Sequence, residues 1–228
     1  MAYELYYSAG SANLVVRMVL EELGLAYADI EVAPRTADRD ARFMAMNPRG
    51  LVPVLVDHEA GVTLYETGAI LLYLAERHGR LAPPITLPPP RAELLKWLFS
   101  LSNGLHADLI YRYYSDRQVG AMESTAPFFA INRGKVLQHL TILDAAIGTG
   151  SDFLLPWGLS ICDFYFGCLV RWAQLYPIGN AALQPDDLAA LGNVTRALAR
   201  LQERDAVRTA LARERIDGPG FVGPGLQR

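Results

Sequence analysis

Two short segments in the first third of the chain combine residue types that suit the recognition of a small peptide. The first, from Asn47 to Leu55, has the sequence NPRGLVPVL. Its Pro53 opens an apparent strand, where the missing N–H would weaken a sheet. A cis Val52–Pro53 bond resolves this, because it turns the backbone and leaves the Val52 N–H and C=O able to pair with an extended peptide. The alternative is a trans proline at a strand edge, with no binding role.

The second segment, YETGAI from Tyr65 to Ile70, joins a predicted strand to a predicted helix. The first N–H groups of a helix have no partner within it, and the helix dipole makes this end favourable for an anion. We therefore expect Thr67 to hold a carboxylate while Glu66 pairs with an ammonium group. Together these fit the zwitterionic end of an amino acid. Capping of the helix by Thr67 is the alternative.

The composition narrows the class of protein that carries these segments. The chain has 228 residues, of which 51% are hydrophobic and 20% charged, as in an ordinary globular protein of one large or two small domains. The net charge is −3 and no run of five basic residues occurs, so we expect no nucleic-acid partner. The N-terminus has no signal-peptide pattern, and no segment has about 18 uninterrupted apolar residues. We therefore expect neither secretion by that route nor a membrane span.

The two cysteines of the chain also bear on the class of protein and its location. Cys162 and Cys168 are the only cysteines, and their spacing places them on largely different faces of a predicted helix. This predicts neither a disulfide framework nor a metal site, and it favours a reducing, cytoplasmic location.

The first 80 residues alternate strand and helix patterns. Strands are predicted over 3–7, 26–32, 53–56 and 62–65, and helices over 13–23, 38–46 and 67–78. Gly24 and Gly79 mark two of the helix ends. The order is βαβ, an irregular helix, then ββα with an antiparallel hairpin. This predicts an α/β domain over residues 1–80.

A proline-rich stretch, LAPPITLPPP at residues 81–90, predicts a linker, because it cannot continue a helix or occupy a central strand. Beyond it we predict an all-helical domain over 91–228, with helices at 91–114, 125–147, 160–176 and 193–212. The closing DGPGFVGPGLQR is rich in Gly and Pro, and we predict that it is a loosely attached tail.

The order and spacing of the two binding segments resemble the thioredoxin-like domain of the soluble glutathione transferases. NPRGLVPVL is similar to the family's cis-proline loop, and Glu66-Thr67 to its glutamate-serine or glutamate-threonine pair. LSICDF, from Leu159 to Phe164, resembles the family's buried capping box, in which Ser160 and Asp163 satisfy amides at the start of the core helix. The resemblance is of a bacterial type with beta-like and delta-like features, and it implies a thioredoxin-like domain followed by an all-α domain.

The resemblance implies that the N-terminal domain binds glutathione as co-substrate, without a metal. The helical domain would supply most of the pocket for a small hydrophobic electrophile. The residues that it implies for glutathione binding are Val52, Pro53, Glu66, Thr67 and Asn13, with Arg35 at the glycyl end and Asn103 near the sulfur. The family also implies a homodimer, and twofold pairing is the commonest assembly.

The residue that favours the thiolate over the thiol is expected within residues 6–13. The beta class would place its cysteine at Ala12, so thiol-disulfide exchange through an enzyme sulfur is not expected. The Gly-Ser pair at 10–11 is similar to that of the delta class, and Ser11 is the preferred thiolate donor. Tyr6 is the alternative, because it falls where the alpha, mu and pi classes keep a tyrosine. Ser8 and Asn13 are further candidate donors.

Two features of the helical domain add candidates. Gly104-Leu105-His106-Ala107 is similar to a Leu-His-Lys stretch of the beta class, whose histidine faces the bound thiol, although alanine replaces the lysine here. His106 is therefore a candidate catalytic residue, with a structural role as the alternative. An aromatic cluster is predicted beside the cleft, as a solvent-shielding wall or an electrophile pocket. Its members are Tyr111, Tyr113 and Tyr114.

The resemblance as a whole implies a cytoplasmic, homodimeric glutathione transferase with a detoxification-type reaction, conjugating the thiolate of glutathione to a small hydrophobic electrophile. Alternatives on the same scaffold are a glutathione-dependent disulfide reductase, peroxidase, isomerase or dehalogenase. A non-catalytic glutathione-binding module is a further alternative, because a fold does not fix a function.

Overall fold

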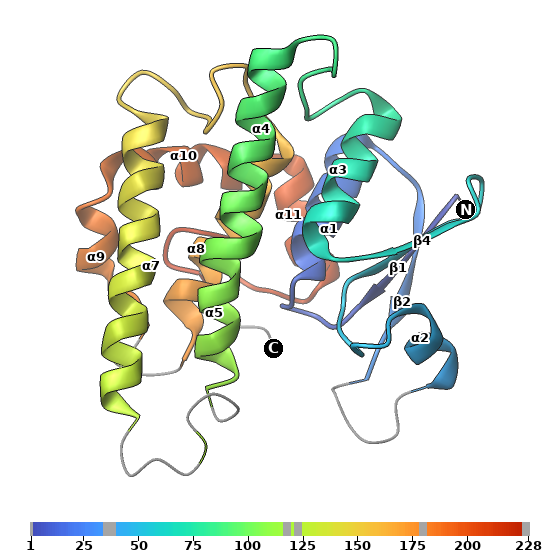
Figure 1. The fold of residues 1–228 in the computed structure, drawn as a ribbon, viewed down its shortest axis with the longest axis horizontal. Helices are drawn as coiled ribbons and strands as arrows, with labels where there is room; N and C mark the ends of the chain where they lie inside the picture. The colour runs from blue at the N-terminus through green and yellow to red at the C-terminus, as the bar shows by residue number, and fades with distance from the viewer. Residues whose placement is uncertain (1, 34–39, 116–119, 121–124, 178–181, 225–228) are drawn as a thin grey trace.

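The protein folds as a mixed sheet with helices, followed by a helical half (Figure 1). The structure, a computed structural model, describes residues 2–33, 40–115, 120, 125–177 and 182–224. The predicted fold class, a thioredoxin-like α/β part followed by an all-α part, is confirmed. None of the helices within these residues is long and apolar enough to cross a membrane.

The N-terminal part follows the predicted βαβ, α, ββα order. Its elements are β1 (Tyr3–Tyr7), α1 (Asn13–Leu23), β2 (Tyr27–Glu31), α2 (Ala41–Met46), β3 (Val54–Asp57), β4 (Val62–Tyr65) and α3 (Thr67–His78). The sheet has the strand order β2-β1-β3-β4. Strand β1 runs parallel to β2 and antiparallel to β3, and β3 and β4 form the predicted antiparallel hairpin. Helix α1 ends at Gly24, whose φ of 70° suits a residue without a Cβ.

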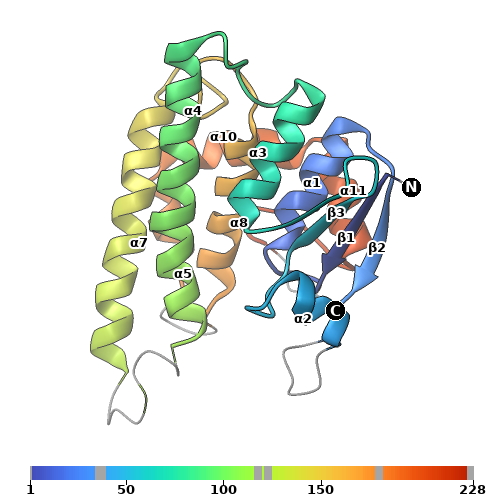
Figure 2. The ribbon, with the colours of Figure 1, turned by 45° about the vertical axis from the view of Figure 1, so that its right-hand side comes forward.

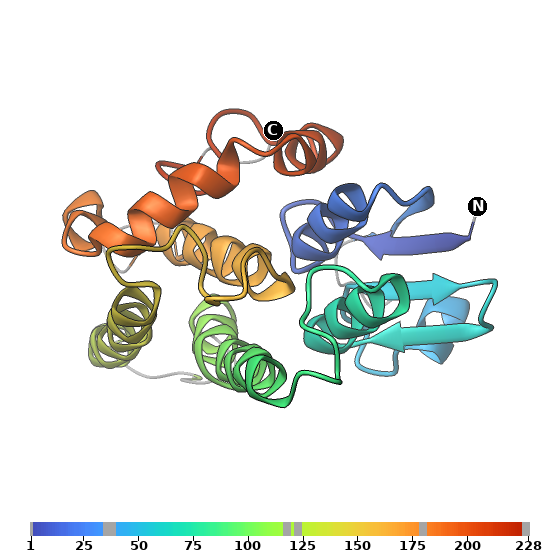
Figure 3. The same cartoon turned by 90° about the horizontal axis from the view of Figure 1, so that it is seen from above.

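Helices α1 and α3 lie between the sheet and the helical half, as Figures 2 and 3 show. Nine of the eleven residues of α1 are buried, because this helix contacts the sheet on one side and helical-half elements on the other. The N-terminus of α1 and the loop that precedes it therefore lie where the two halves meet.

The helical part is arranged around one buried helix. Its elements are α4 (Pro88–Ser100), the π-helical turn η1 (Leu101–Leu105), α5 (His106–Tyr113), α7 (Ala126–Ile147), α8 (Ile161–Leu175), α9 (Pro185–Ala189), α10 (Gly192–Gln202) and α11 (Asp205–Arg213). Twelve of the fifteen residues of α8 are buried. The predicted capping box at its start is confirmed, since the Asp163 carboxylate accepts hydrogen bonds from the Ser160 N–H (2.7 Å) and the Leu154 N–H (2.8 Å).

Three predicted segments differ in detail. Helix α4 begins at Pro88, inside the stretch predicted to be a linker, because a helix leaves its first N–H groups unpaired and proline suits that first turn. The helix predicted over 91–114 contains the π-turn η1. The helix predicted over 193–212 is two helices, broken at 203–204, and the short helix α9 was not predicted.

The prediction of a loosely attached C-terminal tail is wrong for its described residues, 217–224. Phe221 is fully buried, and its ring packs against Gly167 of α8. A Cβ added to this glycine would lie only 3.1 Å from the ring. Arg171 donates a hydrogen bond to the Gly220 carbonyl (3.0 Å), and Gln174 donates one to the Phe221 carbonyl (2.7 Å). The Gly- and Pro-rich composition excluded a helix, but the single aromatic residue attaches the segment.

The docked tail generates the first prediction. Phe221→Ala should lower the free energy of unfolding by about 3–5 kcal/mol, because it opens a cavity against Gly167. Equilibrium urea unfolding measures the change. Pro219→Ala alters an exposed residue of the same tail and should change stability by about 1 kcal/mol or less. Equal effects of the two substitutions would contradict the packing described for Phe221.

Candidate functional site

A cleft of about 440 Å³ opens where the two halves of the molecule meet. Its walls come from the loop after β1, the loop before β3, the start of α3, and the facing sides of α5 and α8. The lining residues are Ser8, Ala9, Gly10, Ser11, Ala12, Asn47, Arg49, Leu51, Val52, Pro53, Glu66, Thr67, His106, Leu109, Ile110, Tyr113, Tyr114, Trp172 and Tyr176. The cleft therefore joins both binding segments, His106, and the loop of residues 8–12 between β1 and α1, here called the serine loop.

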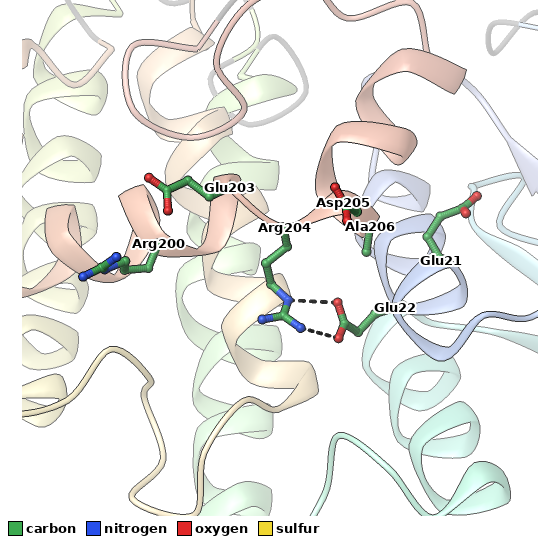
Figure 4. Close-up of a pocket in the computed structure, with 7 residues that line it drawn as sticks. All are labelled: Glu21, Glu22, Arg200, Glu203, Arg204, Asp205 and Ala206. Carbon is green, nitrogen blue, oxygen red and sulfur yellow. Dashed lines mark hydrogen bonds and ion pairs between the residues drawn. The ribbon is translucent and has the colours of Figure 1, made fainter.

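A second hollow of about 520 Å³ lies elsewhere, between the end of α1 and the α10–α11 junction. Figure 4 shows that charged side chains line it and that Arg204 and Glu22 form a two-pronged ion pair there, with contacts of 2.9 and 2.5 Å. It contains none of the predicted site residues and no apolar wall. We therefore place the candidate site in the first cleft, despite its smaller volume.

The loop before β3 supplies the main-chain edge of the cleft. The Val52–Pro53 peptide bond is cis, as predicted. Strand pairing begins only at Val54, and no described residue hydrogen-bonds the Val52 main chain. Asn47, which is buried, shapes the loop by donating to the Leu51 carbonyl (2.8 Å) and accepting from the Arg49 N–H (3.1 Å). The loop thus presents the main-chain N–H and C=O of one residue, Val52, without partners among the described residues.

The start of α3 supplies the polar end of the cleft. Glu66 is the N-cap residue and has a φ of 73°, and no side chain caps the helix there. Thr67 is the first helical residue and is 5% exposed. Thr67 therefore does not cap the helix, and the first N–H groups of α3 are available to an anion.

Arg49 is a cleft residue that the sequence reasoning missed. Its guanidinium lies 2.5 Å from the Glu66 carboxylate, and both side chains are more than half exposed. A pair this exposed contributes about 1 kcal/mol or less, so either partner can exchange the other for a ligand group. The sequence could have indicated this residue, because Arg49 is the one basic side chain of the NPRG segment that precedes the cis-proline.

The serine loop lies between β1 and α1. The Ser11 N–H donates to the Ser8 carbonyl (3.1 Å), and the Ser11 carbonyl accepts from the Leu14 N–H (3.0 Å). Ala12 is the N-cap residue of α1, so Ser11 does not cap the helix. Within the described residues, nothing hydrogen-bonds the Ser11 hydroxyl, which lines the cleft with that of Ser8.

Two of the other candidate donors do not reach the cleft. Tyr6 is 6% exposed, stacks on Phe43, and donates its hydroxyl to Glu4 (3.3 Å). Burial raises the pKa of Tyr6, which keeps this hydroxyl protonated. Asn13 is fully buried, and its side-chain oxygen accepts from the Ser8 N–H (3.0 Å), so it shapes the serine loop from behind.

The remaining predicted positions fall away from the cleft or outside the described residues. Asn103 lies in η1 with an exposed side chain that accepts a hydrogen bond from Ser102 (3.2 Å), and it does not line the cleft. Tyr111 is 47% exposed and does not line the cleft either. Arg35 lies outside the described residues.

His106 faces the serine loop from the helical half. Its Nδ1 lies 2.7 Å from the Tyr165 hydroxyl, and its ring lies 5.4 Å, centroid to centroid, from that of Trp172. Burial lowers the pKa of His106 to about 4. Burial also raises the pKa of Tyr165. At neutral pH both groups are therefore uncharged.

Aromatic side chains form the rest of the helical wall. Tyr113 meets Tyr114 and Tyr176 edge to face, with centroid distances of 4.8 and 5.1 Å. Sequence reasoning missed Trp172 and Tyr176. Tyr165, which contacts His106, and Trp172 are seven residues apart on α8, so both lie on the same face of this helix. This spacing could have identified Trp172 as a second residue near His106. This wall is apolar, while the opposite wall is polar.

The described part of the chain contains no group of three or more His, Cys, Asp or Glu side chains that could hold a metal ion. Both cysteines are buried in α8 and away from the cleft. The polar groups that line the cleft include hydroxyl, main-chain, carboxylate, guanidinium, amide and imidazole groups.

Comparisons with known proteins agree with this geometry. Residues 14–77 match the family model of the glutathione S-transferase N-terminal domain. The chain is 44% identical over 84 residues to the glutathione S-transferase GstB of Escherichia coli, an alignment that covers 36% of this chain and 40% of GstB. It is 32% identical over 139 residues to the disulfide-bond oxidoreductase YfcG of Escherichia coli, covering 58% of this chain and 62% of YfcG.

Structural similarity extends over almost the whole chain. A sphingomonad glutathione S-transferase complexed with glutathione has a TM-score of 0.75 and 26% identity, covering 92% of this chain and 98% of the other. A family model, curated relatives and solved structures thus agree. Residues 14–77 match a glutathione S-transferase N-terminal domain, and the chain as a whole has the fold of the glutathione S-transferases it resembles.

The environment of His106 generates the second prediction. Its pKa is lowered from the usual 6.5 to about 4. Between about pH 4 and 6.5 the histidine is therefore protonated in the unfolded chain but neutral in the native state. The contribution of His106 to stability is therefore fully present above about pH 6.5 and is lost as the pH falls toward 4. The imidazole resonance of His106, assigned with His106→Gln, should stay constant from pH 8 to about 5.5. A titration midpoint near 6.5 in the folded protein would contradict the burial described.

Proposed function

We propose that the protein binds glutathione in this cleft and transfers its thiolate to a small hydrophobic electrophile. The observation that carries the proposal is the juxtaposition in one cleft of a main-chain pairing unit, an uncapped helix start, a serine loop and an aromatic wall. Glutathione is a tripeptide with a zwitterionic γ-glutamyl end and a central thiol. Each part of it has a chemical counterpart in the cleft.

The polar groups divide the binding between them. The Val52 N–H and C=O pair with the cysteinyl unit, as a strand edge pairs with an extended peptide. The Thr67 hydroxyl and the first N–H groups of α3 donate hydrogen bonds to the γ-glutamyl carboxylate, and the Glu66 carboxylate accepts hydrogen bonds from its ammonium group. Arg49, paired with Glu66 in the absence of ligand, is available for a carboxylate of the peptide. Complementary charges thus fix the orientation of the thiol.

Ser11 is proposed to stabilise the thiolate. A free thiol has a pKa of about 8.5, and lowering it by about two units requires about 2.7 kcal/mol of preference for the anion. One hydrogen bond to a charged partner contributes about 1.5–3 kcal/mol. The N-terminus of α1, two residues from Ser11, adds up to about 1 kcal/mol. The hydroxyl and the helix together can therefore supply the shift.

The helical wall is proposed to hold the electrophile against the thiolate. Conjugation forms a carbon–sulfur bond as the leaving group departs with its electron pair, and the thiol proton passes to solvent. His106 is neutral at the pH of the reaction, so in this mechanism it acts as a hydrogen-bonding group and not as a cation. The edge-to-face tyrosines offer apolar surface suited to a flat aromatic electrophile.

Glutathione-dependent disulfide reduction is the second candidate function. The similarity to YfcG favours it, and both cysteines are buried in α8 and do not line the cleft. Without an enzyme sulfur, two glutathione molecules would have to react. The first thiolate attacks the disulfide and releases one thiolate, and the second resolves the mixed disulfide to glutathione disulfide and a second thiol.

Parallel assays separate these functions. Conjugation is followed with an aryl halide, and reduction with a small disulfide substrate in the presence of glutathione, while calorimetry measures glutathione binding. Conjugation in excess of reduction supports the primary proposal. Reduction without conjugation supports the second function, and binding without either reaction supports a non-catalytic module.

The role of Ser11 generates the third prediction. Ser11→Ala should raise the pKa of bound glutathione and reduce thiolate-limited turnover about thirtyfold, for a loss of about 2 kcal/mol. Glutathione affinity should change little, since Val52, Glu66 and Thr67 hold the peptide in both protonation states. Thiolate absorbance against pH measures the shift. Tyr6→Phe is the matched control and should titrate like the wild type; a shift in Tyr6→Phe alone would transfer the role to the tyrosine.

The polar end of the cleft generates the fourth prediction. Glu66→Ala and Thr67→Ala should each weaken glutathione binding by about 1.5–3 kcal/mol, the contribution of a hydrogen bond to a charged group. Thr67→Ser retains the hydroxyl and should bind nearly as well as the wild type. Calorimetric titration with glutathione provides the affinities. Wild-type affinity in both alanine variants would contradict the placement of the γ-glutamyl end.

A homodimeric assembly and a cytoplasmic location complete the proposal. Helix α4 exposes Phe99 and α7 exposes Ile131, at 57% and 66%, which offers apolar surface to a second copy. Both cysteines are unpaired, as expected in a reducing compartment.

A further inference from the structure

We infer that Glu214, at the end of α11, is a positioning residue for the serine loop on the opposite side of the domain boundary. The inference rests on the proposed function, because it concerns how the thiol-activating hydroxyl of Ser11 is held. Glu214 is 1% exposed and lies more than 200 residues from this loop in the sequence. It does not line the cleft.

The Glu214 carboxylate collects three hydrogen bonds from the N-terminal domain. Its Oε2 accepts from the Gly10 main-chain N–H at 2.7 Å. Its Oε1 accepts from Asn13 Nδ2 at 2.7 Å and from Arg17 Nε at 3.0 Å. One side chain of the helical domain therefore holds both the loop and the first turns of α1.

The opposite side of the same glycine is held as well. Trp172 of α8 donates its indole N–H to the Gly10 carbonyl at 3.1 Å. Gly10 has a φ of 73°, a conformation that glycine adopts without steric cost. The helical domain thus binds both polar groups of the residue that immediately precedes Ser11.

This arrangement fixes the loop where the hydroxyl has to act. Within the described residues the Ser11 side chain has no hydrogen-bond partner, so its position follows from its backbone. Loss of the Gly10 contact would let the Ser11 hydroxyl move relative to the sulfur, and displacements of about 1 Å are costly in a reacting geometry. Affinity for the peptide would persist, because the groups proposed to bind it lie on the loop before β3 and at the start of α3.

Glu214→Gln tests the inference with almost no change in shape. The carboxamide can present its oxygen to Asn13 and Arg17 or to Gly10, but its NH₂ then faces an N–H donor on the other side. We expect the pKa of bound glutathione to rise by about one unit and thiolate-limited turnover to fall about tenfold, with glutathione affinity unchanged. An unchanged thiol pKa in folded Glu214→Gln would overturn the inference.

Arg204→Gln is the matched control. Arg204 also joins the helical domain to α1, through its ion pair with Glu22 (Figure 4). It does not line the cleft. It should change the melting temperature without moving the thiol pKa. If Arg204→Gln and Glu214→Gln raise the thiol pKa equally, Glu214 is merely part of a structural interface and the inference fails.

Two further variants separate the positioning role of Glu214 from a general folding defect. In Glu214→Gln, adding Ser11→Ala should change the thiol pKa less than it does in the wild type, because the hydroxyl is already misplaced. If Glu214→Gln does not fold, Trp172→Phe removes the other contact to Gly10 and should raise the thiol pKa as well; no shift there would contradict the inference. Failure of the wild type to form a thiolate would refute the proposed function instead.

Discussion

A positive charge lies fully buried in the middle of helix α1, between the sheet and the helical domain. Arg17 is inaccessible to solvent, and a buried charge without a partner costs several kcal/mol. Glu214 supplies the main compensation from α11, with Asp29 and Tyr27 on β2 as further partners. Burial lowers the pKa of Arg17, but Glu214, Tyr27 and Asp29 together outweigh it, so the pKa is raised and the guanidinium stays charged. Docking of α11 on α1 therefore brings Glu214 to the buried guanidinium as its partner from the helical part.

This requirement links the packing of the molecule to its site. The carboxylate that neutralises Arg17 also binds the Gly10 amide, so the contact that stabilises the domain boundary orders the serine loop too. Helix α8 contributes on the same boundary, since Trp172 binds the loop and forms a wall of the cleft. The thioredoxin-like domain supplies the groups that match a peptide. The helical domain supplies the contacts that hold the serine loop, together with the apolar wall.

Local signals made much of the fold and of the peptide-binding side predictable. The alternation of strand and helix patterns, Gly24 and Gly79 as helix ends, and the two binding segments are all encoded within a few residues. The capping box at Ser160 is equally local. Contacts between distant segments were not predictable: Phe221 attaches the tail through a space left by Gly167, and Glu214 reaches Gly10 across the chain. Tyr6, the alternative thiolate donor, is buried against Phe43, and the alternation of strand β1 already favoured such a core position over a place in the cleft.

The central claim is that the main chain at Val52 and the serine loop hold one glutathione molecule between the two domains. A crystal structure of the protein with glutathione tests it directly. We expect the cysteinyl N–H and C=O within about 3.2 Å of the Val52 main chain, and the sulfur within about 3.2–3.5 Å of the Ser11 hydroxyl. Glutathione bound outside this cleft, or with its sulfur against a different donor and away from Ser11, would contradict the account.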